Sequence, residues 1–165
     1  MSKKIDKKFT FNEIKAIINQ LPSLDSIKST KFQYQLFKIK SAIQKSTEEF
    51  NEFLKTTDCF KKVSEYDEKR IELCKKYAEK DEDGNPKSNG NNFVIDEKNG
   101  EFKVEIFKLY KEYENDLKAL EEIKEENKIE VTFTPIDLNN TPDDLDGSQM
   151  NLIMIFSEED DDKEE

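Results

Sequence analysis

The residues best suited to chemistry in this chain are acidic, but their spacing favours turns over a metal site. The run D-E-D-G-N at residues 81–85 begins like a calcium-binding loop. An EF-hand loop needs glycine at its sixth position and glutamate at its twelfth, where this chain has Pro86 and Asn92. A second acidic group, at residues 143–146, lies in one loop without a partner carboxylate. We therefore predict no metal site and no cofactor, with weak calcium binding at residues 81–85 as the alternative.

Motifs for catalysis are missing from the sequence. Histidine is absent, so no serine or cysteine has the usual activating base. The four glycines do not fall in a phosphate-binding order. The only two cysteines, Cys59 and Cys74, cannot complete a zinc site, and in one helix they would lie about 22 Å apart, too far for a disulfide. We predict that the chain is not an enzyme and has no catalytic residues.

Lysines give the first half of the chain a charge opposite to that of the second half. Residues 1–80 have a net charge of +6 and residues 81–165 a net charge of −17, which together give the total of −11. A nucleic-acid contact through the lysines is one interpretation, although no arginine lies among them. The candidates are Lys3, Lys4, Lys7 and Lys8, followed by Lys28, Lys31, Lys38 and Lys40. The favoured interpretation places this basic part against the acidic C-terminal part, in the chain or in a neighbouring copy, so direct nucleic-acid binding is not expected.

The acidic half also has two interpretations. It is a solvated surface, or it imitates a phosphate backbone and occupies a nucleic-acid-binding protein. Residues 157–165 contain seven acids in nine positions, which predicts a disordered tail. This tail either keeps the protein in solution or shields the lysines between residues 3 and 45 from non-specific nucleic acid.

Glycine and proline divide the chain into predicted helices. Thr10 and Glu13 have the spacing of a capping box, which begins a short helix that Pro22 ends. A second helix is predicted from about Thr30 to Lys80, with Thr56–Asp58 as the place where it would break. A third helix follows the turn region at residues 81–100. Its apolar residues recur every three or four positions, so it should fold back antiparallel onto the second helix.

Short strands complete the predicted elements. Phe93–Ile95 is expected to pair with Phe102–Val104 across Asn99-Gly100, which forms a small β-hairpin at the tip of the helices. Apolar and polar residues alternate from Ile129 to Phe133, which predicts a strand. The apolar run Leu152–Phe156 fits either a short strand or a helical turn.

The predicted second helix is longer than the third, so part of its apolar seam needs another partner. These seam residues are Phe32, Leu36, Ile39 and Ile43. The first helix and the Leu152–Phe156 segment would cover them within the chain. A protein partner or a second copy would cover them otherwise, so we treat them as candidate partner-binding residues. Other aromatic residues at helical spacing are expected in the same core or seam; they are Phe37, Phe50, Phe53, Phe60, Tyr110 and Tyr113.

Together these patterns predict a mainly α protein built as an elongated antiparallel helical hairpin. A short N-terminal helix, a β-hairpin or strand at the tip and a short C-terminal strand accompany the hairpin. Residues 1–156 form one elongated domain in this prediction, and residues 157–165 form the tail.

One stretch resembles a family of small uncharacterised bacteriophage proteins. The resemblance rests on K-Y-A-E-K-D-E-D-G-N at residues 76–85, N-F-V-I at residues 92–95, and a Glu/Lys-rich helix ending in I-E-V at residues 129–131. It covers about residues 60–138. The resemblance implies phage origin and a non-enzymatic role, without catalytic residues to transfer.

We therefore expect a non-enzymatic interaction protein of a bacteriophage, as a structural, assembly or accessory component. Its partner would be a phage structural protein, a host protein or a second copy of the chain. The alternative function is an acidic inhibitor that imitates nucleic acid and blocks a host defence nuclease. The longest apolar run, Leu152–Phe156, is too short to span a membrane, and the expected location is the cytoplasm of the bacterial host or the virion.

Overall fold

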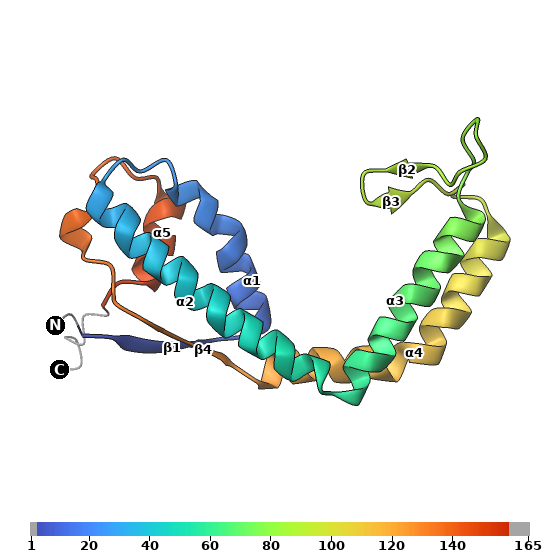
Figure 1. Cartoon of the computed structure of the whole chain (residues 1–165), viewed down its shortest axis with the longest axis horizontal. Coiled ribbons are helices and arrows are strands. Elements are labelled where there is room, and N and C mark those ends of the chain that lie inside the picture. Colours follow the sequence, from blue (N-terminus) through green and yellow to red (C-terminus); the bar gives the residue numbers. More distant parts are fainter. Residues whose placement is uncertain (1–2, 159–165) are drawn as a thin grey trace. The chain divides into compact units, whose positions relative to one another are not determined.

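The computed structural model describes residues 3–158 and divides the chain into two compact units. Unit 1 consists of Met1–Glu52 and Lys124–Glu165, and unit 2 consists of Phe53–Ile123. Helices predominate in both units, and two small antiparallel strand pairs accompany them (Figure 1). The predicted mainly α fold class is therefore confirmed. The structure divides into two units, each of which is described by itself. A single elongated domain over residues 1–156 therefore stays a prediction.

Helix α1 (Phe11–Gln20) begins and ends where local chemistry predicts. The backbone N–H of Glu13 donates to Thr10 Oγ1 at 3.1 Å, and the N–H of Thr10 donates to Glu13 Oε2 at 2.6 Å. These two bonds form the predicted capping box and satisfy two helix-terminal donors. A 3₁₀ helix, η1 (Leu21–Leu24), follows with Pro22 near its start, so the α-helical hydrogen bonding stops there as expected.

The capping box makes the stability of α1 depend on pH. Hydrogen bonds from the backbone and side chain of Thr10 lower the pKa of Glu13 below its ordinary value of 4.5. A lowered pKa in the folded state stabilises the fold above pH 4.5, and this contribution is lost as the pH falls through the folded-state pKa. Glu13→Gln keeps an acceptor but has no charge to titrate. We expect the difference in the free energy of unfolding between wild type and this variant, measured in urea, to shrink below pH 4.5. A difference that stays constant down to pH 3 would exclude this role for Glu13.

The predicted second helix is two helices, α2 (Thr30–Lys55) and α3 (Asp58–Tyr77). A continuous helix from Thr30 to Lys80 was therefore wrong, and the alternative break at Thr56–Asp58 is confirmed. Thr57 produces the break because its Oγ1 accepts from the N–H of Phe60 at 3.3 Å and donates to the Leu54 carbonyl at 2.7 Å. A threonine that bonds to backbone groups on both sides stabilises a helix start in place of a helix interior.

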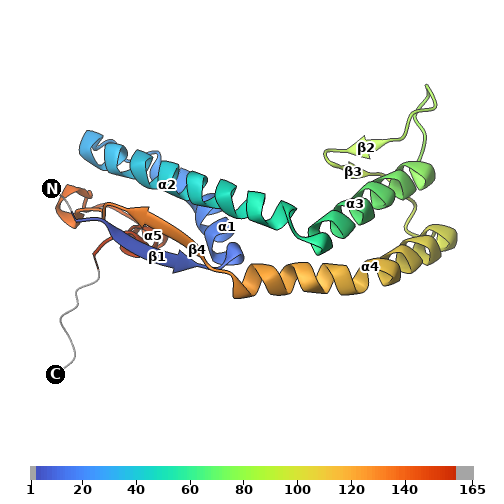
Figure 2. The same cartoon turned by 60° about the horizontal axis from the view of Figure 1, so that its bottom comes forward.

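In unit 2, α3 packs antiparallel on α4 (Gly100–Glu126), which confirms the predicted helical hairpin (Figure 2). The rings of Tyr66 and Tyr113 lie 5.7 Å apart, and so do the rings of Tyr77 and Phe102. Residues later in α3 thus meet residues earlier in α4, as an antiparallel pair requires.

The small hairpin between α3 and α4 differs from the predicted one. Strand β2 (Ser88–Asn89) pairs with β3 (Asn92–Phe93), and Gly90 between them has φ +62. Pairing of Phe93–Ile95 with Phe102–Val104 was wrong, because residues 102–104 are helical. The side chain of Asn99 accepts from the N–H of Phe102 at 3.0 Å, so Asn99 begins a helix here in place of a hairpin turn.

Unit 1 contains a two-stranded antiparallel sheet. The predicted strand is confirmed as β4 (Ile129–Phe133), and its three apolar side chains are buried. Its partner is β1 (Ile5–Phe9), with Ile5 opposite Phe133 and Phe9 opposite Ile129. The sequence analysis did not predict β1, and this strand brings the N-terminal lysines to the sheet.

The apolar run near the C-terminus is helical, so its interpretation as a strand was wrong and the alternative of a helical turn is confirmed. Helix α5 (Gly147–Ile155) begins at a second capping box, formed by Asp146 and Gln149. After it, Phe156 is fully buried, and its ring lies 6.4 Å from that of Phe9 and 5.2 Å from that of Phe133. Together these contacts attach α5 to both strands of the sheet.

The predicted tail begins later than expected. Ser157 is 2% exposed and bridges to Ile136, whose N–H donates to the Phe156 carbonyl at 2.7 Å. Ser157 therefore belongs to the packed part of unit 1, which corrects the predicted boundary. A short 3₁₀ helix, η2 (Leu138–Asn140), follows Ile136. The remaining predicted tail, apart from Glu158, lies outside the described residues.

Candidate functional site

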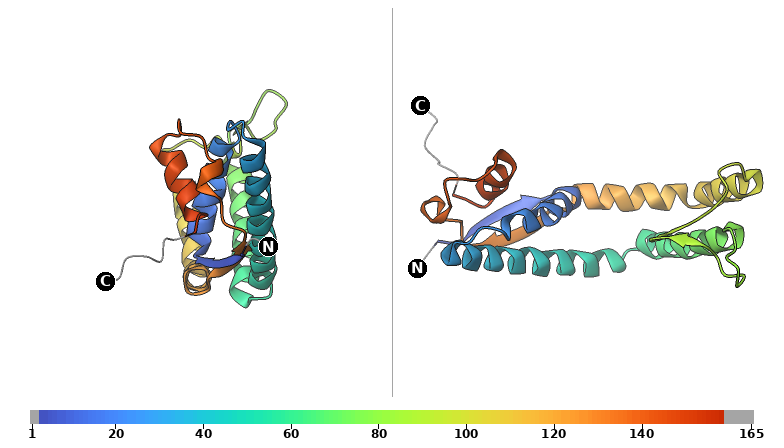
Figure 3. Two further views of the ribbon diagram at one scale, coloured as in Figure 1. Left: turned by 90° about the vertical axis from the view of Figure 1, so that its left-hand side faces the viewer. Right: turned by 90° about the horizontal axis from the view of Figure 1, so that it is seen from above.

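The predicted partner-binding seam forms the core of unit 1. Its four side chains are at most 1% exposed; they are Phe32, Leu36, Ile39 and Ile43. Helix α1 and the β1–β4 pair lie beside α2 (Figure 3), so the chain itself covers this face. We therefore correct the partner-binding assignment, because a partner cannot reach these side chains in the folded unit.

The predicted nucleic-acid lysines lie at or next to strand β1. Lys7 and Lys8 are in β1, and Lys3 and Lys4 precede it. Lys8 Nζ lies 3.5 Å from Glu130 Oε2 on β4. On the same sheet, Thr132 donates to the Asp6 carboxylate at 2.6 Å. The basic N-terminal segment thus pairs with the C-terminal part of the chain, as the favoured interpretation predicts.

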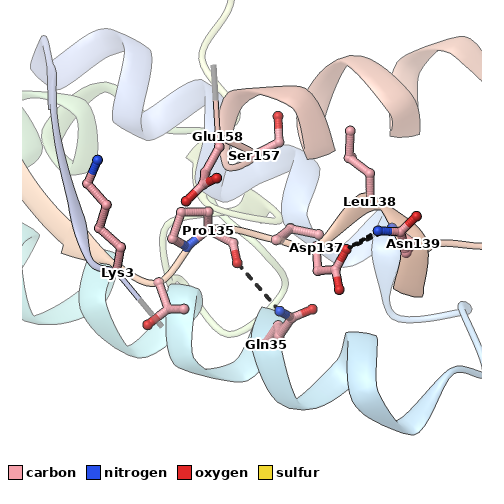
Figure 4. A pocket seen from close by; sticks show the side chains of 10 residues that line it. Lys3, Gln35, Pro135, Asp137, Leu138, Asn139, Ser157 and Glu158 are labelled. Atoms are coloured by element: carbon pink, nitrogen blue, oxygen red, sulfur yellow. Dashed lines mark hydrogen bonds between the residues drawn. The ribbon is translucent and has the colours of Figure 1, made fainter. Parts of the chain in front are cut away.

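A cavity of about 560 Å³ lies beside the sheet in unit 1 (Figure 4). Gln35 on α2 points into it and donates from Nε2 to the Pro135 carbonyl at 3.4 Å. Its Oε1 is buried and accepts no bond from the described residues. Lys3 and Glu158, the first and last described residues, also line the cavity. We assign this cavity no ligand.

The two acidic segments form turns and a helix start. Asp81 Oδ1 accepts from the N–H of Asp83 at 3.0 Å and from that of Asn85 at 2.8 Å, and Gly84 has φ +83. Asp146 caps α5. Among residues 3–158, no three acidic or cysteine side chains are grouped so that they could hold a metal ion. Cys59 and Cys74 are half-buried free thiols on α3.

Some of the acidic residues on α4 are paired with lysines. Glu105 lies 3.1 Å from Lys76 Nζ, and the Tyr77 hydroxyl donates to it at 3.0 Å. These two donors lower the pKa of the Glu105 carboxyl. Further along the helix, Lys111 Nζ lies 2.8 Å from Glu114, which lowers the pKa of that carboxyl. The acidic face of α4 is therefore interrupted by positive charge.

Three aromatic residues that the sequence analysis assigned to the core or seam are exposed, which corrects that assignment. Phe37 is 65% exposed, Phe53 is 44% exposed, and Tyr110 on α4 is 38% exposed.

Phe37 lies near a second exposed aromatic residue of α2, Tyr34, which is 60% exposed. The ammonium group of Lys38 lies 4.4 Å from the centre of the Tyr34 ring. At 100° per residue, Phe37 lies on the face opposite the seam that contains Phe32 and Leu36. The helical angle between Phe37 and this seam was the signal that could have identified Phe37 as exposed.

An apolar groove of about 340 Å³ lies between the end of α1 and α2. Its aliphatic part comes from Ile18, Leu21, Pro22 and Ile43, and its polar lining residues include Lys40 and Glu48. Gln44 lines its edge, and it lies two helical turns after Phe37 on the same side of α2. We use the term α2 surface for the exposed rings of Tyr34 and Phe37, the neighbouring lysines Lys31 and Lys38, and this groove.

A second exposed apolar stripe lies on α4 in unit 2. Val104 is 54% exposed and Phe107 is 58% exposed, one turn apart. Lys111 Nζ lies 5.7 Å from the centre of the Phe107 ring. This stripe resembles the α2 surface in composition, because lysines lie three or four positions from its two apolar residues. It therefore provides a control for experiments on α2.

No protein-family model, curated protein or solved structure matches this chain. The resemblance to phage proteins thus stays a prediction from residues 60–138. No helix within residues 3–158 is long and apolar enough to cross a membrane.

Proposed function

We propose that this chain is a non-enzymatic interaction protein of a bacteriophage, acting as a structural, assembly or accessory component. The observation that carries the interaction role is the exposure of Tyr34 and Phe37, at 60% and 65%, beside an apolar groove. Apolar surface costs about 25 cal/mol per Å² in water, and exposed apolar patches commonly mark protein contacts. The phage assignment is supported by the sequence resemblance over residues 60–138.

The paired charges of α4 favour this proposal over a nucleic-acid mimic. A mimic needs a continuous series of unpaired negative charges, since it competes with a phosphate backbone for a basic site. On α4, Glu105, Glu112 and Glu114 each lie within 3.5 Å of a lysine ammonium group. These three carboxylates therefore do not form part of a continuous series of unpaired negative charges.

The interaction role can be tested during phage infection. A tagged wild-type chain, expressed in infected host cells, should retain a phage or host protein that also binds the chain when both are purified. We expect Tyr34→Ala/Phe37→Ala to weaken this binding at least about tenfold, because removing exposed anchors at an interface costs about 1 kcal/mol or more each. Isothermal titration with the purified partner measures the loss.

The matched control is Val104→Ala/Phe107→Ala on α4, which removes similar apolar area from unit 2. We expect this variant to bind the partner as wild type does. Equal retention by all three proteins, or the absence of any purified partner, would contradict the proposed interaction through α2. Mass spectrometry of purified virions then distinguishes a structural component, present in the particle, from an accessory one.

A further inference from the structure

Two Asn-Gly pairs occur in this chain, at Asn89-Gly90 and at Asn99-Gly100. In such a pair the amide carbon of the asparagine side chain lies next to a backbone nitrogen that no neighbouring Cβ shields. The glycine nitrogen can attack that carbon and close a five-membered ring. The two pairs have the same local chemistry, so a difference between them in the folded chain comes from the fold.

Asn89-Gly90 lies at the turn of the β2–β3 hairpin (Figure 1). Two residue pairs form the ladder of this hairpin, Ser88 with Phe93 and Asn89 with Asn92. A ribbon this short is marginally stable in water, so its turn opens at little cost. Asn89 and Gly90 are exposed, and a Cβ added at Gly90 would meet nothing within 4 Å. The reacting atoms are therefore open to water and free to move.

Asn99-Gly100 is held at the start of α4. The side-chain Oδ1 of Asn99 accepts from the N–H of Phe102 at 3.0 Å, and its backbone carbonyl accepts from the N–H of Lys103 at 3.2 Å. Asn99 is also half-buried, whereas Asn89 is exposed. Closing the ring at Asn99 would break the side-chain bond and distort the first turn of the helix. The helix therefore protects this asparagine.

We propose that Asn89 is a site of spontaneous modification, at which its amide is converted to aspartate and isoaspartate. The Gly90 nitrogen loses its proton to a base and bonds to Asn89 Cγ. The bond from Cγ to the amide nitrogen breaks, and this nitrogen takes up a proton and leaves as ammonia. Water then opens the ring, giving aspartate by addition at Cγ and isoaspartate by addition at the backbone carbonyl carbon. This inference is independent of the proposed function.

The isoaspartate form opens the hairpin, because the backbone then runs through the side chain and is longer by one carbon at Asn89. A strand of two residues cannot absorb this change and keep the register of Ser88 with Phe93. The N–H of Val94 donates to the Lys87 carbonyl at 3.0 Å just beyond this register, and it loses its fixed acceptor. The change is local to the hairpin, so α4 keeps its structure.

Peptide mapping by mass spectrometry tests the site. The purified full chain is kept in mildly alkaline buffer, and the conversion of Asn89 and Asn99 is followed in the same samples. We expect Asn89 to convert at least about tenfold faster than Asn99 in the folded chain, and the two to convert at similar rates in concentrated guanidinium chloride. Asn89→Gln should remove the modification and leave the Asn99 rate unchanged, because glutamine would have to close a six-membered ring.

Amide hydrogen exchange tests the consequence. The isoaspartate form, separated by chromatography, should exchange the N–H of Val94 at least about tenfold faster than the unmodified chain does. The N–H of Lys103 on α4 should exchange at the same rate in both forms. Asn89→Asp is the matched control, because it adds the same charge without lengthening the backbone. This variant should exchange Val94 as the unmodified chain does.

Other results would overturn the inference. Equal conversion of the two asparagines in the folded chain would mean that the fold does not distinguish them. Conversion of neither before unfolding would mean that the hairpin is rigid enough to prevent ring closure at Asn89. If Asn89→Asp speeds the exchange of Val94 as much as isoaspartate does, charge and not backbone length opens the hairpin, and the consequence proposed for isoaspartate is wrong.

Discussion

Replacing Leu36 by aspartate should unfold unit 1. Leu36 is 1% exposed, so the variant would bury a carboxylate without a partner and lose the packing of the leucine. Losing a buried leucine costs about 2–5 kcal/mol, and an unpaired buried charge adds several more, against a total stability of about 5–15 kcal/mol for a typical domain. We expect circular dichroism to show a large loss of helix, and urea titration to show no folded baseline for this unit.

The neighbouring residue supplies the control. Phe37→Asp introduces the same side chain at a position that is 65% exposed, so we expect a change within about 0.5 kcal/mol. A Leu36→Asp variant that stays equally helical and only changes its mass in solution would make this face an interface between chains. That result would restore the partner-binding assignment of Phe32, Leu36, Ile39 and Ile43.

The elements that the sequence predicted correctly depend on local interactions. The capping box of Thr10 and Glu13 joins residues three positions apart, and Pro22 acts on its own turn. Alternation from Ile129 to Phe133 has the period of a strand with one buried face. In each case the information lies within a few residues, so no distant partner is needed to interpret it.

The missed elements depend on distant partners or lack a periodic signal. Strand β1 is stabilised by β4, more than 110 residues away, and Lys7 interrupts the apolar alternation between Ile5 and Phe9. Helix α5 ends in the run L-I-M-I, which is apolar all around and therefore has no helical or strand period. The spacing of Asp146 and Gln149 was its only local signal, through the capping box.

The candidate contact surface on α2 could not be predicted from local sequence patterns either. Helical spacing placed Phe32 and Leu36 on one face correctly, but the spacing is the same whether this face meets the same chain or another one. The fold decides the question, because α1 and the β1–β4 pair lie beside α2 and bury this face within the same chain. The exposure of Tyr34 and Phe37 follows from that choice, so the sequence alone could not identify them as the candidate contact residues.

Phe156→Ala should destabilise unit 1 by about 3–5 kcal/mol, the usual cost of removing a fully buried phenylalanine ring. Phe156 is 0% exposed, and its ring contacts those of Phe9 and Phe133 on the two strands. It therefore connects α5 to the sheet, and its loss leaves a cavity that neither strand can fill alone. The urea midpoint of unit 1 measures the effect.

Met154→Ala is the matched control, because Met154 lies in α5 but is 48% exposed. We expect its unfolding free energy to stay within about 0.5 kcal/mol of wild type, since little apolar area is removed from the core and alanine favours the helix. Equal stabilities of the two variants would mean that Phe156 is not packed between β1 and β4.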